Sequence, residues 1–172
     1  MNGILRAGGL AAILGGSLRI ADSFATNALP QGTLALLYLV TDVFLLAGIA
    51  GLWVKQRAGL RIAGTIGLAM FVVGILLVRA SAFGAGTYQA GATVALLGLA
   101  VYSVESLLRR ISAAPVLWLG AFAAGIAGAA GLAPGAMTVL AGVAFGLGFV
   151  MAGIETIYGA PQSAQTATST VT

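Results

Sequence analysis

The chain has 172 residues, of which 60% are hydrophobic and only 7% are charged. Soluble domains carry about 25% charged residues, so this composition excludes a water-exposed globular protein and indicates an integral membrane protein. The chain contains no cysteine and no histidine, and its net charge of +4 rests on eight Lys and Arg residues. Disulfides, thiol catalysis and the usual ligands of zinc and haem iron are therefore excluded. We expect no metal and no cofactor.

Six apolar segments follow one another with short connections, and charges, prolines or glycine-rich turns bound them. Each is close to the length that crosses a bilayer core of about 30 Å. The sequence thus predicts an all-α integral membrane protein, a compact bundle of six transmembrane helices. The bundle occupies one domain, residues 1–159, and a flexible polar tail follows over residues 160–172. In chain order, the predicted helices are 3–24, 32–54, 60–79, 89–108, 113–131 and 135–158.

The first predicted helix has a competing interpretation as a cleaved signal peptide, because small residues follow it. The core of a signal peptide is an uninterrupted apolar run, whereas Arg19 and Asp22 lie within or beside this one. We therefore expect the segment to be retained as the first spanning helix.

The second predicted helix carries an acid, Asp42, in the middle of its apolar run. A carboxylate at that depth costs roughly 2.5 to 3.5 kcal/mol on insertion scales, so a buried partner is expected. Arg19 in the first helix is the predicted partner, and Tyr38 and Thr41 are candidate polar neighbours. The pair has two interpretations, as a structural link between helices or as a proton or cation site.

The Lys and Arg residues predict the orientation. If both termini are cytoplasmic, the outer side holds only Arg19 and Arg79, and the other six cations lie inside. This bias is typical of a multi-pass protein of a bacterial inner (cell) membrane with both termini in the cytoplasm. The inner cations are Arg6, Lys55, Arg57, Arg61, Arg109 and Arg110.

Two glutamates lie near the inner ends of the fourth and sixth predicted helices. Glu105 is placed to pair with Arg109 four residues later, and such interfacial acids need no special role. The alternative is a shared inner-face polar cluster, which requires the fourth and sixth helices to touch. That candidate cluster consists of Tyr102, Glu105, Glu155 and Tyr158.

Small residues recur at four-residue spacing, which predicts close helix–helix seams in a membrane. In addition, the segments "FLLAGIAGLW" (44–53) and "FVMAGIETIY" (149–158) share a pattern and end at the same predicted face. The match has two explanations, a repeated helical hairpin or chance similarity between Gly/Ala-rich helices. The small-residue rows are Gly8, Ala12, Gly16; Gly120, Ala124, Gly128; and Ala144, Gly148, Ala152.

The sequence contains no phosphate-binding loop of the Walker type and no histidine or cysteine to activate a nucleophile. We therefore expect a non-enzymatic protein. The favoured hypothesis is an accessory or partner-binding subunit of a membrane assembly. The alternative is a small solute or ion transporter, or the substrate-binding subunit of one, that uses Asp42 with Arg19. The expected partners are the lipid bilayer and other membrane subunits or further copies of the chain, and not nucleic acid.

Overall fold

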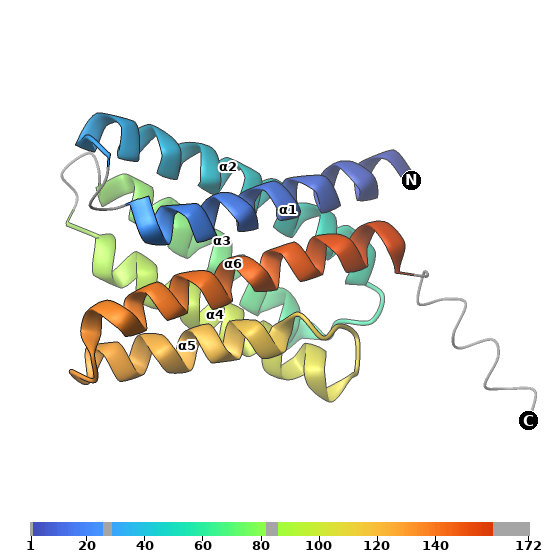
Figure 1. The fold of residues 1–172 in the computed structure, drawn as a ribbon. Helices are drawn as coiled ribbons and strands as arrows, with labels where there is room; N and C mark the ends of the chain where they lie inside the picture. Colours follow the sequence, from blue (N-terminus) through green and yellow to red (C-terminus); the bar gives the residue numbers. More distant parts are fainter. Residues whose placement is uncertain (1, 26–28, 82–85, 160–172) are drawn as a thin grey trace, which may run out of the picture.

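A computed structural model describes residues 2–25, 29–81 and 86–159, which form six helices and no strand (Figure 1). The predicted all-helical fold is thereby confirmed, and the predicted tail 160–172 lies outside the described residues. Each helix begins and ends within two residues of its predicted bounds. The helices are α1 (Asn2–Ala25), α2 (Gln31–Gln56), α3 (Ile62–Ser81), α4 (Tyr88–Leu108), α5 (Pro115–Ala129) and α6 (Pro134–Tyr158).

Five of these helices are long and apolar enough to cross a membrane, as expected of a multi-pass membrane protein. The exception is α5, which has only 15 residues. Because a helix rises 1.5 Å per residue, α5 covers about 22 Å, which is less than a bilayer core of about 30 Å.

The six helices form three consecutive hairpins, α1–α2, α3–α4 and α5–α6, arranged as a ring. Extensive packing of α1 on α6 joins the first hairpin to the third, whereas α2 and α3 touch at few positions. One end of the bundle holds both Asn2 and Tyr158, and we call it the terminal end (Figure 1). The opposite end is the far end.

Glycines allow the backbones of neighbouring helices to touch. A Cβ atom added to Gly8 of α1 would lie 2.5 Å from the Cα atom of Gly51 in α2. A Cβ atom on Gly67 of α3 would lie 2.6 Å from the carbonyl oxygen of Gly98 in α4. Since lipid tails are as apolar as side chains, such close packing holds helices together in a membrane. Gly120 of α5 was expected at a close helix–helix contact, but no atom lies within 4 Å of a Cβ atom added to it, so it lies outside any such contact between the described residues.

Aromatic side chains fill the interior between α3, α4, α5 and α6. Phe71, Tyr102, Trp118 and Phe149 are each no more than 2% exposed. Their rings form a chain of contacts, with centroids 5.7 Å apart for Tyr102 and Trp118 and 5.1 Å apart for Trp118 and Phe149. The indole N–H of Trp118 donates to the backbone carbonyl of Phe145 at 3.2 Å. The centre of the bundle is therefore a packed core.

The second helices of the three hairpins, α2, α4 and α6, have buried residues at equivalent positions along their lengths. Gly48, Gly98 and Gly148 are buried at intervals of fifty residues, and the next residue in each helix is a large apolar one that is also buried. The middle hairpin therefore shares with the first and third hairpins the same pattern of buried positions. The further buried sets at this spacing are Leu52, Tyr102 and Ala152, and Gln56, Ser106 and Thr156.

Candidate functional site: a charged cluster in the far half

The far half of the bundle holds four charged residues, which we call the far-half cluster: Arg19, Asp22, Asp42 and Arg79. The α1 helix contributes Arg19 and Asp22, α2 contributes Asp42, and α3 contributes Arg79. Two cations and two acids leave the cluster with no net charge. The net charge of +4 of the chain therefore belongs entirely to the terminal end.

The expected ion pair between Arg19 and Asp42 is not what the structure shows. Asp42 pairs instead with Arg79, whose Nε–H donates to the Oδ2 atom of Asp42. The side chain of Asp42 is 13% exposed and that of Arg79 is 28% exposed, so the pair is largely withdrawn from the surface. Arg79 lies two residues before the end of α3, and its long side chain extends to α2.

Arg19 takes a different position from the predicted one. Its guanidinium carbon lies 5.9 Å from the centre of the Phe145 ring in α6, in the range of a cation–π contact. Its charge still acts on both Asp22 and Asp42. Arg19 is thus a neighbour of the acids and joins α1 to α6.

Asp22 is the member of the cluster whose burial the sequence did not reveal. It is only 1% exposed, and its carboxyl group interacts with Thr41 and with the charges of the other three members. Of the candidate polar neighbours, Thr41 is also 1% exposed, and Tyr38 is half-buried. The burial of Asp22 could have been inferred by counting charges in the sequence. Two arginines in the far half of an apolar bundle need two acids if all the charges are to be compensated.

This arrangement has two chemical capabilities. A compensated network of charges links α1, α2 and α3 where the surroundings are apolar, and breaking it leaves an uncompensated charge. The same cluster could also exchange a proton, since a proton on the Asp42 carboxylate would release Arg79 from its partner.

Glu105 stabilises the start of the helix that precedes its own. Its carboxylate accepts hydrogen bonds from the backbone N–H groups of Arg61 and Gly64 at the beginning of α3. The expected pair with Arg109 is also present, with the Nε atom 3.2 Å from the Oε1 atom of Glu105. Because the first amides of a helix lack internal partners, a carboxylate is well placed there.

Glu155 makes the corresponding contacts in the third hairpin. Its carboxylate accepts hydrogen bonds from the hydroxyl group of Ser112 and from the backbone N–H of Ala113 at 3.1 Å, just before α5 begins. The ammonium group of Lys55 donates to the backbone carbonyl of Glu155. Lys55, Glu105 and Glu155 occupy equivalent positions at fifty-residue spacing, and the side chain of each makes a hydrogen bond to the backbone of another segment at the terminal end.

The predicted inner-face cluster does not form. The hydroxyl group of Tyr102 donates to the side-chain oxygen of Gln56 in α2 at 2.6 Å, while Tyr158 is 80% exposed. Glu105 and Glu155 each bind a different loop. The physical reason is that α4 and α6 do not pack on one another, because α5 packs against both.

Within the described part of the chain, no group of three or more His, Cys, Asp or Glu residues is placed to hold a metal ion. Comparisons with protein-family models, with curated proteins and with solved structures give no significant match for this chain.

Proposed function

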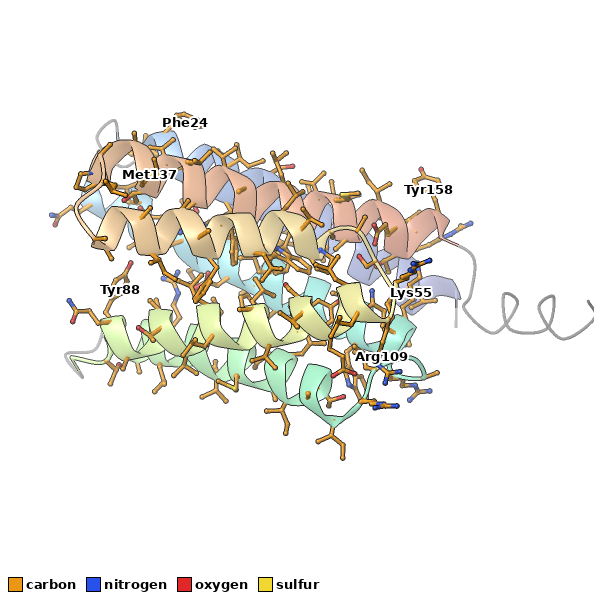
Figure 2. The ribbon with its side chains drawn as sticks, turned by 90° about the horizontal axis from the view of Figure 1, so that it is seen from below. Phe24, Lys55, Tyr88, Arg109, Met137 and Tyr158 are labelled. Carbon is orange, nitrogen blue, oxygen red and sulfur yellow. The ribbon has the colours of Figure 1, made fainter. Side chains whose placement is uncertain are left out.

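We propose that the protein is a non-enzymatic accessory or partner-binding subunit of a membrane assembly. All six helices span the inner membrane of a bacterium, and both termini lie in the cytoplasm. The position of the excess charge supports this orientation, because the terminal end carries six of the eight cations. Lys55 and Arg109 lie at this end together with Tyr158, whereas Tyr88 and Met137 lie at the other (Figure 2).

The observation that carries the proposal is that side chains fill the interior of the bundle. The aromatic core fills the space between the helices, and Asp42 is committed to Arg79. A substrate path through the centre would have to displace Phe71, Trp118 and Phe149, which are almost fully buried. The surfaces left for function are the outer faces of the helices.

Among those faces, α5 is the one best suited to a partner helix. It is about 8 Å shorter than a bilayer core, and association with another protein relieves such a mismatch. Gly120 lies on its exposed face with no atom within 4 Å of an added Cβ. A glycine there allows a partner helix to approach closely.

The decisive experiment is extraction of the protein from its native membrane in a mild detergent, followed by measurement of the mass and protein content of the complex. We expect a second membrane protein in fixed stoichiometry. The variant Gly120→Leu should weaken this complex. The matched control is Gly32→Leu in α2, which also has no atom within 4 Å of an added Cβ and should leave the complex intact. A lone monomer would contradict the proposal.

The far-half cluster favours a second candidate function, transport of a small solute or an ion with Asp42, Arg19 and Arg79 as the coupling groups. Ionisable residues inside membranes are often functional. The test is flux into proteoliposomes that contain only this protein. Transport predicts flux that Asp42→Asn abolishes without loss of folded protein, whereas the accessory subunit predicts no flux from either form.

A further inference from the structure

A long open groove runs along the outer face of the α3–α4 hairpin at the terminal end. It has a volume of about 1040 Å³, and we call it the α3–α4 groove. Its floor is apolar, and Val101 and Val104 in it are 39% and 49% exposed. The lining residues are Leu60, Arg61, Ile62, Ala63, Ala100, Val101, Val104, Glu105, Leu108 and Arg109.

The polar groups of this groove lie at one of its ends. Arg61 and Arg109 supply two cations there, and Glu105 supplies one acid. The carboxylate of Glu105 is already bound by two backbone amides and by Arg109. Among the described residues, the guanidinium group of Arg61 makes no ion pair. The groove therefore combines a net positive rim with an apolar floor.

The dimensions of the groove match one leaflet of a bilayer. From Arg109 to Ala100 the lining covers nine residue steps along α4, or about 13 Å at 1.5 Å per residue. Half of a bilayer core is about 15 Å thick. With the rim at the depth of the headgroups, the floor follows the acyl chains toward the middle of the membrane.

We propose that the α3–α4 groove binds a phospholipid with an anionic headgroup. The phosphate lies between Arg61 and Arg109, and one acyl chain lies along Val101 and Val104. Charge complementarity favours this occupant, because the rim is cationic. The two acids of the terminal end, Glu105 and Glu155, already accept hydrogen bonds from backbone N–H groups of the chain. A soluble anion would use the rim but not the floor, and an apolar helix would leave Arg61 without a counter-charge.

The test is titration of the purified full-length protein in detergent with phosphatidylglycerol and with phosphatidylcholine, with binding read by native mass spectrometry. We expect phosphatidylglycerol to bind the more tightly. Arg61→Gln should weaken its binding about fivefold, since a cation near an anionic lipid surface contributes about 1 kcal/mol. Arg6→Gln is the matched control, because Arg6 is exposed at the same end but lies outside the groove, and it should have no effect.

A second pair of variants tests the floor without changing any charge. Val104→Trp places a bulky ring on the floor where the acyl chain would lie, and it should weaken retention of phosphatidylglycerol. Val43→Trp makes the same change at a position of α2 that is 59% exposed, and it should leave retention unchanged. Because both side chains are exposed, neither change crowds the core.

Three results would overturn the proposal. Equal binding of the two lipids would mean that the rim does not select charge. Equal losses in Arg61→Gln and Arg6→Gln would mean that only the general positive potential of the terminal end acts. Displacement of phosphatidylglycerol by inorganic phosphate at similar concentration would show that the rim binds free phosphate and that the floor contributes nothing.

Discussion

The pairing of Asp42 with Arg79, in place of Arg19, can be tested by a double-mutant cycle. The variants are Asp42→Asn, Arg79→Gln and the combination of both, and a second cycle replaces Arg79→Gln with Arg19→Gln. Each single change removes one charge and leaves a polar side chain; Asp42→Asn keeps the side-chain shape, and Arg79→Gln shortens it. The free energy of unfolding of each variant then gives the coupling energy between the two side chains.

The exposure of the two side chains sets the expected magnitude. Removal of one partner from a fully buried ion pair costs about 3 to 5 kcal/mol, because the other charge is left uncompensated. Arg79 retains 28% exposure and Asp42 13%, so we expect a smaller cost than for a fully buried pair, about 2 to 3 kcal/mol for each single variant. The double variant leaves neither charge behind, and it should recover about 1 to 2 kcal/mol relative to the sum of the singles.

Reversible unfolding in mild detergent, followed by tryptophan fluorescence, is a suitable assay. Trp118 is 2% exposed and reports on the core, and a Trp53→Phe background removes the more exposed tryptophan. We expect Asp42 to couple more strongly to Arg79 than to Arg19, which acts on it only through its charge. Stronger coupling to Arg19, or strict additivity with Arg79, would refute the reasoning.

Three further predictions concern the terminal end and the helix seams, and each is checked by the same unfolding measurement. Glu105→Gln should cost about 1 to 3 kcal/mol, because two amides at the start of α3 lose a charged acceptor; an unchanged free energy would contradict this role. Tyr102→Phe should cost about 1 to 3 kcal/mol by leaving the buried oxygen of Gln56 without its donor, and adding Gln56→Leu should recover part of the loss. Gly98→Ala should cost about 1 to 3 kcal/mol, because its Cβ would meet backbone atoms of α3 at 2.5 Å, whereas Gly120→Ala, with no atom within 4 Å, should cost nothing. Equal effects of the two alanine substitutions would refute the role of close backbone packing.

The helices could be predicted from the sequence because apolar length is a local property. Each helix ends within two residues of its predicted bounds, since charges and turn residues directly flank the apolar runs. The positions of Glu105 and Glu155 near one end follow from the same information. Their binding partners do not, because Arg61 and Ala113 lie more than forty residues away in the sequence.

The partner of Asp42 could not be predicted for a related reason. The acid was expected to need a cation, and it has one, but depth along a helix does not identify which neighbouring helix supplies it. The sequence favours Arg19 because it lies a few residues inside the outer end of a neighbouring helix, and it places Arg79 on the outer side. The long side chain of Arg79 carries its guanidinium group from the end of α3 to Asp42, whereas Arg19 lies against Phe145.

The packing of the ring gives a physical reason for placing Asp42 in an apolar helix. Glycine contacts already join α1 to α2, and others join α1 to α6, so those seams need no ionic link. The seam between α2 and α3 is the most sparsely packed of the ring, and Asp42–Arg79 is the ion pair that crosses it. Without a hydrophobic driving force between helices in lipid, a sparsely packed seam depends on polar contacts. The pair of Asp42 and Arg79 therefore joins the two helices of the ring that pack least closely, and this role explains why an acid lies inside the apolar α2 helix.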